Sequence, residues 1–245
     1  MPAPRHKYRT SDFHGYFPTG VKWLLVSNVA MFLVWYLGGR PVQSHLLTVL
    51  ALTPELAVGN FFIWQLFTYL FLHGGFWHLI FNMLTLWMFG TPLEQDWGTR
   101  RFLKYYFLCG IGAGVCDIAV NMALGHWRTT TIGASGAIYG LLLAFGVLYP
   151  NQTVLMNFLF PIKAKYMVMI YAAVELFMSL GVNSGVSNVA HLGGMLIGLV
   201  YLKPRLPRLR LPDVRGPYRQ WRMHRAKKKF QVYMRKQGGR GPWVN

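Results

Sequence analysis

Residues 132–149 read IGASGAIYGLLLAFGVLY, an apolar run in which Ser135 is the one strongly polar residue, and Pro150 follows it. Further apolar runs occupy roughly residues 23–37, 76–93, 102–123, 166–182 and 189–202. Several runs are shorter than the roughly 20 residues of a simple bilayer span, but they are rich in small residues, as close-packed membrane helices are. We therefore predict an all-α membrane protein with six transmembrane helices, one for each run.

The composition favours the same class of protein. Hydrophobic residues make up 53% of the chain and charged residues only 13%, about half the ~25% of an average soluble domain. The charge is strongly basic, with 25 Lys and Arg against 7 Asp and Glu. Such an excess suits either nucleic acid or an anionic membrane surface, so the positions of the basic residues decide between them.

The basic residues are unevenly distributed over the predicted spans. With a cytoplasmic N-terminus, 23 of the 25 fall on the cytoplasmic side and only Arg40 and Arg128 fall outside, as the positive-inside rule requires. Both termini are therefore predicted to be cytoplasmic. The chain divides into a basic N-terminal segment (1–22), a six-helix membrane core (23–202) and a basic tail (203–245).

Two segments outside the spans carry expectations of their own. Residues 38–72 form a long outer loop whose aromatic side chains, such as Trp64 and Phe67, suit the membrane interface. The tail holds fourteen basic residues and one acid, Asp213, so we expect it to fix the topology and to bind anionic lipid head groups. A protein or nucleic-acid partner is the alternative, but no sequence-specific nucleic-acid motif is present, and we expect no nucleic acid.

Polar side chains in membrane spans are costly and are functional candidates, and four of those in the predicted spans stand out. They are His78 and Asn82 in the second span, Ser135 in the fourth and His191 in the sixth. Counted from the cytoplasmic helix ends at about 1.5 Å per residue, all four lie about 18–24 Å above the inner edge of a core about 30 Å thick. Four unrelated packing residues are not expected to share one layer.

These side chains supply the parts of acyl-transfer chemistry. A serine nucleophile needs a base, and His191 is available to Ser135. A tetrahedral intermediate needs hydrogen-bond donors, and His78, Asn82 and the backbone N–H of Ser135 can provide them. The pattern therefore predicts a serine hydrolase site inside the membrane core.

Each motif also has a purely structural interpretation. Gly133 and Gly136 beside Ser135 permit close backbone approach or unusual torsions, yet Gly-Ala-Ser-Gly is also typical of helix packing. His78 and Asn82 share a helix face and equally suit an interhelical hydrogen bond. The depth that these residues have in common is what favours the functional interpretation.

At this point the chain resembles the rhomboid family of intramembrane serine proteases over roughly residues 60–200. The resemblance is carried by His73-x4-His78-x3-Asn82, Gly133-Ala134-Ser135-Gly136, Ala190-His191-x2-Gly194-x3-Gly198 and Leu93-Glu94-x3-Gly98. Each motif alone is only moderately specific, but all of them in this order on these helices are highly specific.

The resemblance implies a six-helix core in which Ser135 is the nucleophile and His191 the base of a dyad. It assigns His78 and Asn82 to the oxyanion site and gives Gly133 and Gly136 supporting positions beside the serine. The implied activity is endopeptidase cleavage of single-pass transmembrane proteins near the outer membrane face. This implied activity includes no cofactor and no metal.

The resemblance also implies supporting roles. Tyr139 would stack on the catalytic imidazole, and His73 would help to hold the outer loop. Glu94 would tie the inner end of the second span to nearby arginines. The helix at 166–182 would be the gate for a transmembrane substrate.

The chain departs from the family pattern at three positions. The family usually has Trp-Arg in the outer loop where this chain has Trp64-Gln65, which puts the usual anchoring of the loop in question but not the chemistry. Glu175 and Asp117 are carboxylates in spans that the resemblance does not explain. We expect Glu175 to be paired with a neighbouring polar group or protonated. A role as a third catalytic member is a less favoured alternative, because packing of Tyr139 can orient His191 without an acid.

Other functions fit less well. A zinc protease would need His-Glu-x-x-His, whereas residues 78–82 read HLIFN, and an aspartyl protease would need two membrane aspartates, whereas only Asp117 qualifies. A transporter is disfavoured because the halves show no inverted repeat. A non-catalytic rhomboid-like protein that binds transmembrane helices remains the main alternative. The absence of organelle-targeting features favours a multi-pass protein of a bacterial inner membrane.

Overall fold

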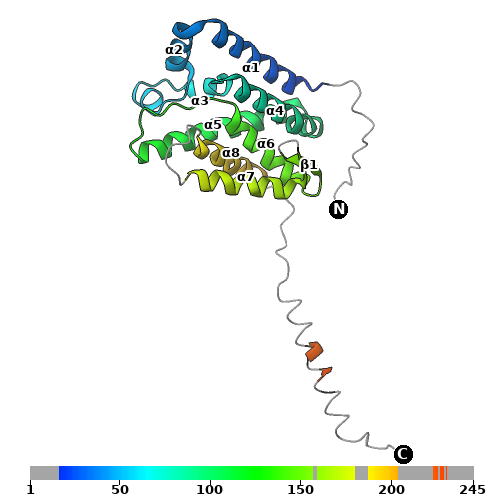
Figure 1. Ribbon diagram of the computed structural model, residues 1–245. Helices are drawn as coiled ribbons and strands as arrows, with labels where there is room; N and C mark the ends of the chain where they lie inside the picture. Colours follow the sequence, from blue (N-terminus) through cyan, green and yellow to red (C-terminus); the bar gives the residue numbers. More distant parts are fainter. Residues whose placement is uncertain are drawn as a thin grey trace, which may run out of the picture. The chain divides into compact units, whose positions relative to one another are not determined.

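The computed structural model describes residues 17–156, 159–179 and 187–203, together with 223–225, 227, 228 and 230 of the tail. Most of these residues are helical (Figure 1). Each apolar run of the sequence carries one helix of the described chain, namely α1 (Thr19–Leu37), α4 (Phe76–Trp97), α5 (Thr99–Ala123), α6 (Ser135–Leu148), α7 (Ala164–Ser179) and α8 (Asn188–Leu202). The apolar runs therefore located these helices correctly, with differences of a few residues at the ends.

These helices differ in length and hydropathy. Within the described residues, α1 and α5 are long and apolar enough to cross a membrane, with 19 and 25 residues and a mean hydropathy of 1.5 each. The helices α6 and α8 are apolar but have only 14 and 15 residues. A 14-residue helix rises about 21 Å, which is less than the roughly 30 Å of a hydrocarbon core.

Helix α6 lies among α4, α5, α7 and α8 (Figure 1). Its contact with α8 is very close, because a Cβ added at Gly194 would overlap the carbonyl oxygen of Gly136. On the side of α5, a Cβ added at Gly136 would lie 2.6 Å from the Cβ of Ala113. Small residues thus let three helices meet backbone to backbone, as is common in membrane bundles. We call this contact of α5, α6 and α8 the glycine seam.

The outer loop predicted at 38–72 is largely helical. It contains α2 (Gly39–Leu50), the π-helical turn η1 (Glu55–Gly59), the short helix α3 (Gln65–Thr68) and the 3₁₀ turn η2 (Tyr69–Phe71). The segment was expected to be a loop because its apolar residues show no run long enough for a span. Its side chains Phe61 and Trp64 are exposed, as expected for a segment that meets a membrane interface.

Gln65 anchors this segment in the place where the family usually has arginine. Its side chain is fully buried. Its Oε1 accepts from the backbone N–H of Thr53 at 3.1 Å, and its Nε2 donates to the carbonyl of Thr48 at 3.0 Å. A neutral amide offers both a donor and an acceptor, so this departure from the family pattern changes the anchor without removing it.

The prediction of an all-α fold is wrong in one short segment. Strands β1 (Thr153–Met156) and β2 (Phe160–Lys163) form an antiparallel pair in which Thr153 faces Lys163. The strands contain β-branched and aromatic residues, which favour extended backbone. They were missed because each has only four residues and lies between two apolar runs.

Glu94 has different partners from those expected. Its carboxylate accepts hydrogen bonds from the backbone N–H groups of Gly20 and Val21, both at 2.7 Å, and from Oγ1 of Thr99 at 2.6 Å. Arginines were predicted, but the first turn of α1 supplies N–H groups that have no partner within the helix, and it carries a partial positive charge. The buried Glu94 therefore joins α4 to the start of α1.

The chain divides into two compact units, Met1–Pro204 and Arg205–Asn245. The described residues of the second unit, Met223 to Arg225, Lys227, Lys228 and Phe230, are helical and exposed. The expectations for residues 1–16 and for most of the basic tail lie outside the described residues.

Candidate active site

The turn that leads into α6 sets the position of Ser135. Gly133 has a φ of +118°, a region that residues with a side chain rarely adopt. A Cβ at this position would also lie 2.8 Å from Nε2 of His78. The backbone N–H of Gly133 donates to the carbonyl of Tyr69 at 2.9 Å. Ser135 is then the first residue of α6, so its own N–H lies in the turn whose donors lack helical partners.

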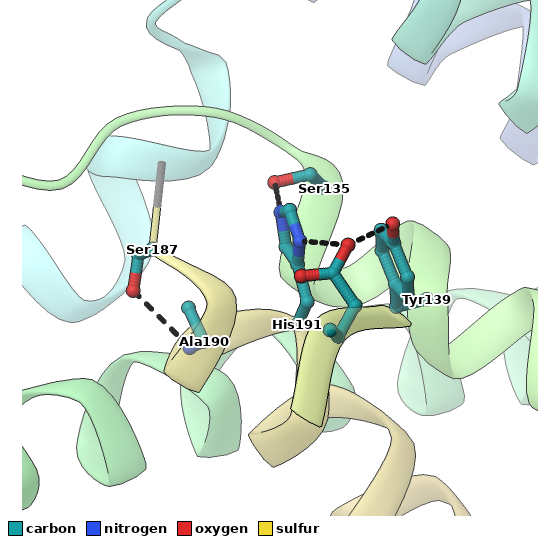
Figure 2. Close-up of polar contacts among 6 residues, drawn as sticks. Ser135, Tyr139, Ser187, Ala190 and His191 are labelled. Carbon is teal, nitrogen blue, oxygen red and sulfur yellow. Dashed lines mark hydrogen bonds and ion pairs between the residues drawn. The ribbon is translucent and has the colours of Figure 1, made fainter. Parts of the chain in front are cut away.

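The structure brings Ser135 and His191 together from α6 and α8. The Oγ of Ser135 lies 2.7 Å from Nε2 of His191 (Figure 2), a hydrogen-bond distance at which the imidazole can take the hydroxyl proton. His191 lies in the first turn of α8 and is buried. Its ring is stacked on that of Tyr139, with centroids 4.2 Å apart and an angle of 9° between the planes.

The four polar residues singled out by the sequence face one cavity. Its volume is about 1450 Å³, and its lining includes Ser135, His191, His78 and Asn82. Gly133, Gly136 and Tyr139 line the same cavity. These residues come from α4, α6, α8 and the turn before α6, so the common depth inferred from the sequence corresponds to a common cavity.

Asn82 presents an unused donor to this cavity. Its side chain is buried, and its Nδ2 has no hydrogen-bond partner within the described residues. A buried donor without a partner costs about 1–3 kcal/mol, so its retention calls for an explanation. A Cβ at Gly133 would lie 3.8 Å from this Nδ2, which places the amide beside the turn that carries Ser135. The arrangement suits an oxygen atom that arrives only during a reaction.

His73 lies outside the cavity lining. It is fully buried between η2 and α4, and its ring meets that of His78 edge-on at 5.0 Å. Burial, and then the neighbouring His78, lower the pKa of the His73 imidazole to about 3, so this ring is neutral at physiological pH. Its place is consistent with the structural role implied by the resemblance.

Glu175 of α7 lies in the site, although the sequence did not favour a catalytic role for it. Its Oε1 lies 3.0 Å from Nδ1 of His191, on the side of the ring opposite Ser135. The hydroxyl of Tyr139 donates to the same Oε1. From the sequence we expected Glu175 to have a polar partner or a proton. The sequence alone could not identify that partner as His191, because the two residues lie on different helices.

Asp117 of α5 accepts hydrogen bonds from side chains on both sides of the candidate dyad. Its carboxylate accepts from Oγ1 of Thr131 at 2.8 Å and from Nδ2 of Asn121 at 3.1 Å, and Ser187 donates to it as well. The Oγ of Ser187 in turn accepts from the backbone N–H of Ala190 at 3.2 Å and caps α8 (Figure 2). Asp117 therefore joins the turn before Ser135 to the helix start that carries His191.

Comparison with known proteins gives a consistent family assignment. The Rhomboid domain family matches residues 60–208. The putative rhomboid protease YdcA of Bacillus subtilis (strain 168) is 34% identical over 168 residues, which cover 68% of this chain and 80% of that protein. Rhomboid protease GluP of the same strain is 28% identical over 197 residues, or 79% of this chain and 36% of that protein.

A plant relative shows the same similarity over a shorter range. RHOMBOID-like protein 1 of Arabidopsis thaliana is 33% identical over 157 residues, or 62% of this chain and 38% of that protein. The chain thus spans about two-fifths of the length of this relative, whereas the family match covers more than half of the chain. With a helical fold and the family's motifs in order, the chain belongs to the rhomboid family.

Proposed function

We propose that the chain is an intramembrane serine endopeptidase that cleaves single-pass transmembrane proteins near the outer membrane face. Ser135 is the nucleophile and His191 the base. The observation that carries this proposal is the 2.7 Å contact between Ser135 Oγ and His191 Nε2. The unpaired Nδ2 of Asn82 in the same cavity supports it.

The proposed topology has six spans, with both termini in the cytoplasm of a bacterial cell. The inner end of α6 then lies near the cytoplasmic boundary, and its 14 residues rise about 21 Å through a core of about 30 Å. Ser135 at its other end therefore lies about 10 Å below the outer boundary. A cavity at this depth can admit water from the outer side.

The first half of the reaction is acylation. His191 Nε2 takes the hydroxyl proton while Ser135 Oγ forms a bond to the scissile carbonyl carbon. The oxyanion is held by His78, Asn82 and the N–H of Ser135. The intermediate collapses, the carbon–nitrogen bond breaks, and the proton on His191 passes to the leaving amine. The products are an acyl ester on Ser135 and a free amino terminus.

The second half is hydrolysis of the ester. His191 takes a proton from water, whose oxygen attacks the acyl carbon. The bond to Ser135 Oγ breaks, and the proton returns from His191 to that oxygen. The carboxyl terminus is released and the enzyme is restored, so the reaction consumes one water and needs no redox partner.

The proposed substrate route passes along α7. Its residues Val174, Leu176, Phe177 and Met178 are 46–74% exposed, which suits contact with lipid or with another transmembrane helix. We further propose that the basic tail binds anionic lipid head groups, because it contains fourteen basic residues and only one acidic residue. Both features would hold a membrane-bound substrate and enzyme in the same layer.

The test is fluorophosphonate labelling of the detergent-solubilised protein. Serine attack on phosphorus with loss of fluoride is expected in the wild type and not in Ser135→Ala or His191→Ala. Cleavage of a transmembrane peptide is likewise expected in the wild type and not in either variant. Labelling that survives in Ser135→Ala would contradict the assigned nucleophile. A folded wild type that neither labels nor cleaves would favour the alternative, a rhomboid-like protein that binds helices without cutting them.

A further inference from the structure

The acid on α7 has a chemical role that the dyad alone does not include. We propose that Glu175 is a positioning residue that orients His191 and balances the charge of its imidazolium, so that Ser135, His191 and Glu175 act as a unit. This inference rests on the proposed function. It means that a helix outside the glycine seam contributes to the reaction.

The burial of Glu175 is unlike that of its neighbours on α7. Glu175 is 7% exposed, whereas the residues beside it, Val174 and Leu176, are 46% and 57% exposed. A carboxylate that turns away from the lipid-facing side and into the bundle is costly unless it is paired. In the C-terminal half of α7, Glu175 is thus a buried residue, and its carboxylate lies beside His191 in the site.

The pairing is made with the atom that a positioning acid must meet. Oε1 of Glu175 lies 3.0 Å from Nδ1 of His191, while Nε2 of the same ring faces Ser135 at 2.7 Å. A carboxylate at Nδ1 selects the tautomer with its proton there and leaves Nε2 free to accept. The carboxylate keeps its charge throughout and takes no proton. It stabilises the imidazolium that forms when Ser135 attacks.

Tyr139 holds the two groups in place. Its hydroxyl donates to Oε1 of Glu175, and its ring stacks on His191 at 4.2 Å. In the resting state Nδ1 makes no well-aligned hydrogen bond to any described residue, although the distance to Oε1 is that of an ion pair. Such contacts commonly tighten only in the reacting complex, when the imidazole becomes charged.

The experiment measures the rate of fluorophosphonate labelling as a function of probe concentration. This separates the maximal rate of serine attack from the affinity for the probe. Glu175→Gln keeps the shape and removes the charge, so we expect the maximal rate to fall about 10- to 100-fold, the effect of one charge-assisted hydrogen bond, with unchanged probe affinity. Glu175→Asp keeps the charge on a shorter side chain and is expected to label at an intermediate rate.

The matched control is Glu55→Gln. Glu55 pairs with Arg128 at 2.9 Å in the outer segment, so this variant should label at the wild-type rate. Thermal unfolding in detergent shows whether each variant is folded. If Glu175→Gln is not folded, the labelling rate of Glu175→Asp is compared with that of the wild type instead. Wild-type rates in Glu175→Gln, or a Glu175→Asp rate no higher than that of Glu175→Gln, would overturn this inference alone. A wild type that does not label would overturn the proposed function as well.

Discussion

Helices α8 and α7 both flank α6, but they pack on it in different ways. In the glycine seam, α8 comes so close that Gly194 leaves no room for a Cβ beside the carbonyl of Gly136. The C-terminal half of α7 instead exposes large apolar side chains and buries Glu175. The difference separates two tasks: the seam fixes the backbones that carry Ser135 and His191, whereas α7 combines an exposed apolar face with one buried carboxylate beside His191.

Adding one methyl group to the seam should have the largest effect. Gly194→Ala would force apart the backbones of α6 and α8, so we expect a destabilisation of about 3 kcal/mol or more and near-complete loss of labelling. Thermal unfolding and labelling of the same preparation measure both. Gly59→Ala is the control, because nothing lies within 4 Å of a Cβ at Gly59. Equal stability of the two variants would show that the seam is not packed tightly, and the contrast with α7 would then not hold.

Removing the unused donor should slow the reaction without loosening the seam. Asn82→Ala deletes a buried amide whose Nδ2 has no partner, so we expect stability to be retained and the cleavage rate to fall about 10²-fold, as for loss of one oxyanion donor. The measurement is kcat for a transmembrane peptide, beside the unfolding temperature. A drop in stability with unchanged kcat would show that Asn82 only packs.

The Asp117 contacts should behave as part of the seam and not as part of the chemistry. Asp117→Asn keeps the size but cannot accept all of the hydrogen bonds from Thr131, Asn121 and Ser187. We expect a loss of about 1–3 kcal/mol of stability and a smaller loss of labelling rate than in Glu175→Gln. The two variants compared side by side would thus separate an acid that links Thr131 to Ser187 from one that acts on His191.

The smallest effect is expected on the exposed side of α7. Phe177 is 74% exposed, so Phe177→Ala should change stability by no more than about 0.5 kcal/mol and leave labelling of Ser135 unchanged. Cleavage of a transmembrane peptide is the sensitive measurement, because the proposed substrate route passes along this helix. A large loss of stability would show that α7 is packed as tightly as α8.

The sequence predicted the helices and brought together the polar residues of one cavity, because both follow from apolar length and from distance along a helix. It could not predict contacts that depend on the rotation of one helix against another. Glu175 and His191 meet across two helices, and two of the partners of Asp117, Thr131 and Ser187, are 14 and 70 residues away in sequence.

Some buried side chains have backbone groups as hydrogen-bond partners, and residue types in the sequence do not indicate such partners. Glu94 was expected to meet arginines, yet it accepts from N–H groups of α1. Every residue except proline has a backbone N–H, so the residue types at 20 and 21 do not indicate this contact, although a Cβ at Gly20 would lie 3.0 Å from both carboxylate oxygens of Glu94. The anchor at Gln65 was hidden for a similar reason, since it exchanges hydrogen bonds with backbone atoms of Thr48 and Thr53.

The contact between Glu94 and the start of α1 also sets an order of events during biosynthesis. Gly20 is translated 74 residues before the carboxylate that receives its N–H. At about 5–20 residues per second, the ribosome needs about 4 to 15 s to reach that glutamate. The first turn of α1 therefore lacks its carboxylate partner until α4 has been made, so this contact can form only after α4 is present.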